Sequence, residues 1–407
     1  MTRYESITRL GSWVGYDVKD EYLEDRAGVR WCVIHLQLKP RQQRCCSGCG
    51  TAVAAIHDVV ERQVRDLPIF EYPVELHLPR VRVACPYCGP KLEQLSWLEP
   101  MARVTSRLAA SVARLCSVMS ILHVAGFYAL NWKTVKAIDY RHLERSLGPI
   151  DLTGVEVLGM DEFAIQKGHR YATVIVDPRR KQVLWICRGR AREDIRPFFE
   201  LLGAAGRDRL KAVVIDMNAA YAKEVQAQCP NAKIVYDLFH VVAKYGREVI
   251  DRVRVDEANR VRHERPARQI VKRSRWLLLK NRENVAPDDQ VRLDELLAAN
   301  RQLFTVYVLK DDLKTLWDYR HPGYAMRFWK QWYRRAMRSG IEPLRRFAQN
   351  LKPYLSGILA HSQWPLGTNL IEGINNKIKV IKRMAYGYRD DAYFFLKIRA
   401  AFPGVGR

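Results

Sequence analysis

The sequence lacks an uninterrupted hydrophobic run of membrane-spanning length. Its most apolar stretch, residues 108–130, contains Arg114 and His123, so we expect no membrane association. The first six residues lack the basic-then-apolar order of a secretory signal, which favours a cytoplasmic, reducing setting. Nine cysteines in 407 residues are too few for a disulfide scaffold, and in such a setting they indicate metal binding.

Acidic residues are scarce relative to basic ones. The chain has 44 Asp and Glu against 68 Lys and Arg, a formal net charge of +24. A compact chain with this charge repels itself unless a polyanion balances it, so nucleic acid is the first partner to expect. Residues 256–407 alone hold 30 basic and 15 acidic groups, so we expect much of the nucleic-acid-binding surface there. The alternative is that these charges only face solvent.

Four cysteines form two C-x-x-C-Gly knuckles, Cys46 with Cys49 and Cys85 with Cys88. Each knuckle offers two thiolates, and tetrahedral Zn²⁺ takes four, so we predict one structural zinc ion. Cys45 could replace Cys46, and the 35 residues between the knuckles exceed the usual zinc-ribbon spacer. Two redox pairs or free thiols are the other interpretation. A knuckle that reads DNA would look the same.

Residues 111–146 have the pattern of a helix-turn-helix. We expect an apolar first helix, a turn at 126–130 and a second helix that Asn131 caps. The second helix carries the predicted DNA-binding residues Lys133, Lys136 and Arg141. Helix pairs are equally common in protein cores, so simple packing stays an alternative.

From residue 154 the pattern changes to strands. We expect strands at 154–160, 171–176, 182–187, 211–215 and 233–236, and helices near 195–202 and 219–228. This order, with helices after it, is that of ribonuclease-H-like proteins, in which the first and fourth strands are neighbours. The expected fold class is α/β: a ribonuclease-H-like core (β-β-β-α-β-α-β-α) with an α-helical insertion, preceded by a zinc-knuckle domain and a helix-turn-helix domain.

Two carboxylates follow strands of this core. Asp161 should end the first strand and Asp216 the fourth, so both could bind one ion at the sheet edge. Glu372, in a helix capped by Thr368 or Asn369, is the candidate third ligand. Three carboxylates can hold two Mg²⁺ or Mn²⁺ ions about 3.5–4 Å apart and promote phosphodiester chemistry. The alternative is two strand-end caps and one surface glutamate.

Further polar residues are expected around this site. Asp237 and His240 follow the fifth strand, and Glu162 should face away from Asp161 as a supporting group. The remaining candidates lie on two helices: Asn375, Asn376, Lys379, Lys382 and Arg383 after Glu372, and Arg327, Lys330 and Arg334 on the predicted helix 324–337. We expect the cations to bind DNA phosphates. The alternative is that they are exposed surface charges without a binding role. The aromatic stripe of helix 324–337 should be core.

In order along the chain, these motifs resemble DDE transposases of the ISL-three family. The resemblance rests on residues 159–163, 167–171, 216–221, 237–240, 371–383 and 385–388. It implies a bacterial, nucleoid-associated recombinase that binds the terminal inverted repeats of an insertion sequence in double-stranded DNA. It also implies cleavage at those ends, joining of the freed 3′-hydroxyl to target DNA, and a homodimer on paired ends. Asp161, Asp216 and Glu372 would be its catalytic triad.

The expected domains follow from these patterns. They are a zinc-binding domain (1–98), a helix-turn-helix domain (99–150), a catalytic core (151–255), a helical insertion (256–360) and a C-terminal core helix (361–407). Two other functions stay open on sequence grounds. A zinc and helix-turn-helix repressor would need only the first 150 residues, and a nuclease on the same core would cut DNA without joining it.

Overall fold

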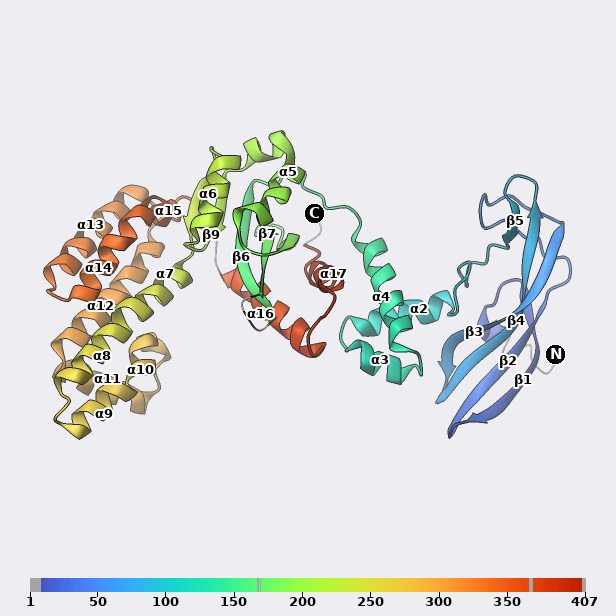
Figure 1. Ribbon diagram of the computed structural model, residues 1–407, viewed down its shortest axis with the longest axis horizontal. Helices are drawn as coiled ribbons and strands as arrows, with labels where there is room; N and C mark the ends of the chain where they lie inside the picture. Colours follow the sequence, from blue (N-terminus) through green and yellow to red (C-terminus); the bar gives the residue numbers. More distant parts are fainter. Residues whose placement is uncertain (1–8, 167, 169, 366–368, 405–407) are drawn as a thin grey trace. The chain divides into compact units, whose positions relative to one another are not determined.

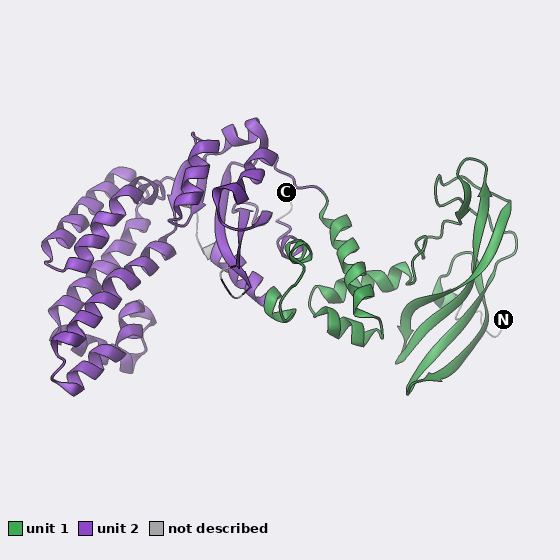
Figure 2. Cartoon of the chain, viewed as in Figure 1, with its two compact units in different colours: residues 1–148, 381–397 green, residues 149–380, 398–407 purple. Residues whose placement is uncertain are grey.

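In the computed structural model the chain forms two compact units (Figures 1 and 2). The structure describes residues 9–166, 168, 170–365 and 369–404. Unit 1 comprises residues 1–148 and 381–397, and unit 2 comprises residues 149–380 and 398–407. The division falls within helix α16 (Asn369–Met384), so the C-terminal region contributes to both units. No described helix is long and apolar enough to cross a lipid bilayer.

Unit 1 begins with a β-sheet in the order β1-β2-β4-β3, with β5 paired to β4. Its strands are β1 (Tyr16–Arg26), β2 (Val29–Leu38), β3 (Ile56–Ile69), β4 (Tyr72–Cys85) and β5 (Gly89–Leu92). β3 and β4 are 14 residues each and form one long hairpin. In β4 the buried residues Val74, Leu76 and Leu78 alternate with more exposed polar ones, and β3 is mostly exposed, so no long apolar run marks either strand. This hairpin fills the long spacer between the knuckles.

Three helices follow: α2 (Ser106–Cys116), α3 (Ile121–Phe127) and α4 (Trp132–Leu147). The predicted cap of α4 is confirmed, since Asn131 Oδ1 accepts a hydrogen bond of 2.9 Å from the Lys133 backbone N–H. The expected single first helix was wrong. It ends after Cys116, and the Ser120 hydroxyl caps a new helix by accepting from the His123 N–H.

Residues of helix α17 (Asp391–Ala401) complete unit 1 through a buried polar network. The Lys397 ammonium donates to Asp139 Oδ2 at 3.0 Å and to the Cys116 carbonyl at 2.6 Å. The Tyr393 hydroxyl donates to the same Asp139 carboxylate, which is 1% exposed. At the edge of this contact Lys136 pairs with Asp390 at 2.7 Å. The buried charge of Asp139 therefore has two partners, both from the end of the chain.

Unit 2 is built on a mixed sheet in the order β10-β9-β6-β7-β8. Its strands are β6 (Val157–Gln166), β7 (Arg170–Asp177), β8 (Gln182–Arg188), β9 (Ala212–Ile215) and β10 (Lys233–Tyr236), with α5 (Arg192–Arg209) after β8 and α6 (Ala219–Gln228) after β9. The predicted β-β-β-α-β-α-β order and the pairing of first and fourth strands are confirmed.

One strand end was misplaced in the prediction. Asp161 lies inside β6, because the ladder with β7 continues as far as the Gln166–Arg170 pair. Phe163 and Ile165 are each 5% exposed, and this alternation extends the strand beyond its continuous apolar run. Asp216 does follow directly after β9, as expected.

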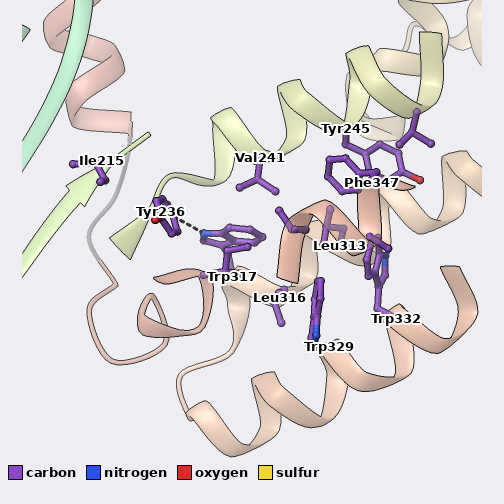
Figure 3. Close-up of a cluster of buried hydrophobic side chains, with 14 of the residues drawn as sticks. Ile215, Tyr236, Val241, Tyr245, Leu313, Leu316, Trp317, Trp329, Trp332 and Phe347 are labelled. Atoms are coloured by element: carbon purple, nitrogen blue, oxygen red, sulfur yellow. Dashed lines mark hydrogen bonds between the residues drawn. The ribbon is translucent and has the colours of Figure 1, made fainter. Parts of the chain in front are cut away.

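The remainder of unit 2 is helical. The elements are α7 (Leu238–Tyr245), a π-helical turn (Gly246–Ile250), α8 (Asp251–Arg260), α9 (Arg265–Arg273), α10 (Arg275–Leu279), α11 (Pro287–Ala299), α12 (Arg301–Thr315), α13 (Pro322–Arg338), α14 (Glu342–Leu351) and α15 (Leu355–Ala360). The aromatic stripe of α13 is core as predicted, since Trp329 and Trp332 are buried (Figure 3). Trp317 Nε1 donates to the Tyr236 carbonyl at 3.4 Å, which ties the helices to the end of β10 (Figure 3).

The buried network of α17 predicts a large cost for losing one partner. We expect Lys397→Met to destabilise unit 1 by about 3–5 kcal/mol, because Asp139 would remain as an uncompensated buried charge. Hydrogen exchange of α2 and α4 in the full-length protein would measure this as lost protection. Lys136→Met breaks a half-exposed pair and should cost below about 1 kcal/mol.

The double variant Asp139→Asn/Lys397→Met removes both charges and should recover most of the protection. If Lys397→Met leaves exchange in α2 and α4 unchanged, α17 does not stabilise this unit.

Candidate active site and metal centre

The four knuckle cysteines converge in unit 1. The Sγ atoms of Cys46, Cys49, Cys85 and Cys88 all lie within 4.8 Å of one another. The group contains the predicted Cys46, and Cys45 is outside it. No other set of three or more possible ligand residues is gathered this closely in the described part of the chain. Four sulfur donors at this spacing fit tetrahedral Zn²⁺, which would hold the two hairpin ends together.

The backbone conformation at the knuckles explains why each of them ends in glycine. Gly50 and Gly89 have φ of 72° and 68°, the left-handed region that favours glycine. The Gly48 N–H donates to Cys46 Sγ at 3.3 Å, and Cys49 Sγ lies 3.3 Å from the Thr51 hydroxyl. This contact with Thr51 is the main cause that lowers the pKa of the Cys49 thiol to about 6. A thiolate, the form that binds metal, is therefore available at neutral pH.

The strand register of unit 2 aligns three aspartates. Gly159 of β6 pairs with Val214 of β9, and Ile215 of β9 pairs with Tyr236 of β10. All three strands run parallel, so continuing the register sets Asp161, Asp216 and Asp237 in one row across the sheet. Parallel strands thus bring together carboxylates that are 55 and 21 positions apart in the chain.

Asp161 is the most buried of the proposed catalytic acids. Burial raises its pKa to about 6, and the charges of Asp216 and Asp237 push in the same direction while His240 opposes them. Burial also raises the pKa of Asp216, whose Oδ1 accepts a 3.0 Å hydrogen bond from the Asn218 N–H. Like charges held together in a partly buried site are unfavourable until a cation binds.

Helix α16 supplies the residue that touches Asp161. Asn375 Nδ2 donates to Asp161 Oδ2 at 2.5 Å, and Asn375 is only 8% exposed. Its Oδ1 is buried and has no hydrogen-bond partner among the described residues. A Cβ on Gly159 would lie 2.7 Å from Ile371 Cδ1, so this glycine is what lets the helix approach β6. An unpaired amide oxygen beside carboxylates fits a hard cation such as Mg²⁺.

Glu372 lies on the same helix, one turn before Asn375, and is exposed. It contributes to no ion pair or hydrogen bond in the described part of the structure, so its carboxylate is available for a ligand. The structure thus brings Asp161 and Asp216 together, and it places Glu372 on the helix that contacts Asp161. The predicted cap Thr368 and the motif residues Lys167 and His169 lie outside the described residues.

The other predicted site residues have defined partners. His240 Nε2 lies 4.0 Å from Asp161 Oδ1 and 3.9 Å from Asp237 Oδ2, between the two acids. Asp237 Oδ1 also accepts from the Phe239 N–H at 2.7 Å and so caps α7. Glu162 forms an ion pair with Arg190 at 3.2 Å, a partner that the sequence did not suggest.

Most of the predicted DNA-binding cations are exposed. They are Lys133 and Arg141 on α4, Arg327, Lys330 and Arg334 on α13, and Lys379 and Arg383 on α16. Lys382 is half-buried, and Lys136 is engaged with Asp390. Lys379 Nζ donates to Asn376 Oδ1 at 3.2 Å, which leaves its remaining protons for an anion.

Two residues have a larger part in the geometry of this site than the sequence pattern indicates. Asn375 appeared as a supporting residue, yet it makes the direct contact between α16 and Asp161. Gly159 appeared only as part of a motif, although it sets how closely the helix approaches. A glycine within an apolar strand run is a recognised signal of close approach and could have indicated this contact.

Comparison with known proteins gives matches along nearly the whole chain. A family model for the transposases of the ISL3 (ISL-three) family, of the DDE type, matches residues 158–398. A model described as the zinc-finger of transposase IS204/IS1001/IS1096/IS1165 matches residues 42–88, and one for the helix-turn-helix domain of transposase family ISL3 matches residues 93–143.

Two similar proteins are also named as transposases of insertion sequence elements. The chain is 55% identical over 401 residues to the transposase for insertion sequence element IS1001 of Bordetella parapertussis, covering 98% of each protein. It is 29% identical over 397 residues to the transposase for insertion sequence element IS1557 of Mycobacterium tuberculosis, covering 91% of this chain and 88% of that protein.

The cysteine cluster predicts a structural zinc ion. Cys85→Ser should abolish stoichiometric zinc binding and lower the thermal stability of unit 1, because the site then has three thiolates. Elemental analysis of the purified protein should give about one zinc per chain for the wild type and for Cys45→Ser, the control outside the cluster. Equal zinc loss in both variants would contradict this assignment.

The row of Asp161, Asp216 and Asp237 predicts that the thermal stability of the protein depends on pH when divalent ions are absent. Because the folded-state pKa of Asp161 is raised to about 6, the stability it contributes is present at low pH and is lost as pH rises through 6. Asp161→Asn should therefore raise the melting temperature at pH 8 by about 2–4 °C, with a smaller gain at pH 5.

Differential scanning fluorimetry in EDTA would measure this effect. Glu200→Gln, an exposed acid on α5, is the control and should give no gain. Added Mg²⁺ should stabilise the wild type more than Asp161→Asn. A lower melting temperature for Asp161→Asn at pH 8 would contradict the electrostatic argument.

Proposed function

The chain belongs to the ISL3 family of transposases, and from this premise we propose that Asp161, Asp216 and Glu372 are the residues with which it cleaves and joins DNA. The observation that carries the proposal is the parallel register of β6 and β9, which sets Asp161 beside Asp216. Glu372 comes from the helix whose Asn375 binds Asp161. A repressor without catalysis would need none of these contacts.

We further propose that unit 2 contains a ribonuclease-H-like core. The support is its strand order, in which three antiparallel strands are followed by two that run parallel to the first. The helices of residues 256–360 then form the insertion between the core and α16. In such a topology an acid on β6 and an acid after β9 would lie near the carboxyl ends of parallel strands, where a helix from later in the chain can supply a third acid.

The chain's own residues prepare this site for phosphoryl transfer. Divalent cations bound by the three carboxylates supply Lewis acidity and lower the pKa of a water or sugar hydroxyl. Asp161 is held by Asn375 and by the Glu162 N–H, and Asp216 by the Asn218 N–H. These hydrogen bonds fix the carboxylate rotamers while leaving lone pairs for two Mg²⁺ or Mn²⁺ ions. Glu162 stays paired to Arg190 and is not a ligand.

DNA contacts complete the proposal. We propose that α4 binds the terminal inverted repeats through Lys133 and Arg141. The phosphates near the scissile bond would be bound by three cations of α16: Lys379, Lys382 and Arg383. The exposed stripe of Arg327, Lys330 and Arg334 on α13 would hold further backbone phosphates of end or target DNA. A homodimer on paired ends, acting at the nucleoid, would let two such sites join both ends.

The catalytic assignment is tested with a duplex that carries the terminal inverted repeat, taken from the DNA that flanks the coding sequence. With Mg²⁺ the wild type should nick the repeat end and join it to a target plasmid. Asp161→Asn, Asp216→Asn and Glu372→Gln should each lower both steps by about 10³-fold or more, because a metal ligand is lost. Gel shifts in EDTA should show binding within twofold of the wild type.

Matched variants make the outcome specific. Glu162→Gln, next to Asp161 but ion-paired, should retain activity within about tenfold. If Asp237→Asn is inactive while Glu372→Gln is active, the third carboxylate is Asp237. Binding without any nicking would favour a repressor, and nicking without joining would favour a nuclease.

A further inference from the structure

The helical insertion contains a pocket that none of the proposed catalytic or DNA-binding residues lines. It has a volume of about 850 Å³ and lies among α9, α10 and α11. Its lining includes the side chains of Ile270 and Trp276, which are 60% and 67% exposed. Isolated exposed aliphatic residues are ordinary on a protein surface, but a tryptophan and an isoleucine that share one pocket form a continuous apolar surface.

The segment that forms this pocket is strongly cationic. Nine of the 23 residues from 260 to 282 are Arg or Lys, and only Glu264 is acidic. Several of the cations are neutralised locally: Arg260 pairs with Glu257, and Arg275 pairs with Asp251. Arg273 and Lys280, which line the pocket, are exposed and have no ion-pair partner among the described residues. Two carboxylates of α11, Asp289 and Glu295, also line the pocket, and Asp289 pairs with Arg292 at 3.7 Å. The cations available to an anionic ligand therefore lie on the side of the pocket formed by α9 and α10.

The helix that carries Trp276 is anchored, while the Trp276 ring stays largely exposed. The Arg275 guanidinium lies 5.2 Å from the centre of the indole ring and is itself bound by Asp251 at 2.9 Å. The end of α10 is fastened by Lys310, whose buried ammonium donates to the Leu278 and Lys280 carbonyls, each at 2.9 Å. Because the backbone of α10 is anchored, little of the helix has to become ordered when a planar ligand stacks on the exposed ring.

We propose that this pocket binds an unpaired base of a DNA strand, with Trp276 as the stacking surface and Arg273 and Lys280 on the adjoining phosphates. Stacking on an aromatic side chain is the common way in which proteins hold single-stranded DNA, and cations along the strand supply the rest of the affinity. A fully paired duplex cannot offer a base face to the pocket. An apolar peptide would leave the bordering cations without partners, so the charge favours DNA.

The inference rests on the proposed function only in taking DNA as the ligand. Its test uses the full-length protein in EDTA, so strand cleavage plays no part and the catalytic assignment can fail independently. Two duplexes of the same sequence serve as probes, one fully paired and one with a single unpaired 2-aminopurine. The wild type should bind the second duplex more tightly and quench the 2-aminopurine fluorescence through stacking.

Trp276→Ala should weaken binding to the unpaired-base duplex about tenfold, abolish the quenching and leave the fully paired duplex unaffected. Trp276→Phe keeps a ring and should retain most of the affinity, which separates stacking from folding defects. The double variant Arg273→Gln/Lys280→Gln should weaken binding and reduce the slope of log affinity against log salt by up to about two.

Tyr324→Ala and Arg346→Gln remove an exposed ring and an exposed cation on α13 and α14, outside the pocket, and are the matched controls. Equal weakening of both duplexes by Trp276→Ala, or undiminished quenching in that variant, would overturn the proposal. A loss of the same size in Tyr324→Ala would also overturn it, because that ring lies outside the pocket.

Discussion

The parallel pairing of β6 with β9 is the interaction on which the candidate active site depends. The ladder pairs Gly159 with Val214, and this register, continued by two residues, aligns Asp161 with Asp216; the register of β10, continued by one residue, aligns Asp237 with them. A slip of one residue would turn one of these side chains to the other face of the sheet. Buried residues on both faces hold the register, since Leu158, Val213 and Val235 are each at most 1% exposed.

This arrangement has an electrostatic cost that the rest of unit 2 must offset. Asp161 is largely buried, its neighbours Asp216 and Asp237 carry the same charge, and His240 stands about 4 Å from two of the acids. One continuous buried core, which joins sheet residues such as Leu158 and Val213 to Trp332 and Phe347 of the insertion, can offset this cost (Figure 3). A site built for cations is thus supported by packing elsewhere in the unit.

Much of this organisation could be predicted from the sequence because its signals are local. Each knuckle is a five-residue motif, Asn131 caps α4 by accepting from the backbone N–H two residues on, and the strand before Asp216 is a short apolar run. The misses have non-local causes. The long β3–β4 hairpin is stabilised by pairing across strands, and β6 extends past Asp161 because β7 continues the ladder. The contact of Asn375 with Asp161 joins residues 214 positions apart, which no periodicity reveals.

The closing of unit 1 by α17 has a consequence for synthesis of the protein on the ribosome. Asp139 is translated early, whereas Tyr393 and Lys397, which bind its carboxylate, emerge only after unit 2 has been made. A nascent or prematurely terminated chain therefore presents helices α2 to α4 around a buried acid that lacks its partners. The order of translation thus delays a finished DNA-reading unit until the acids of unit 2, Glu372 included, are already present.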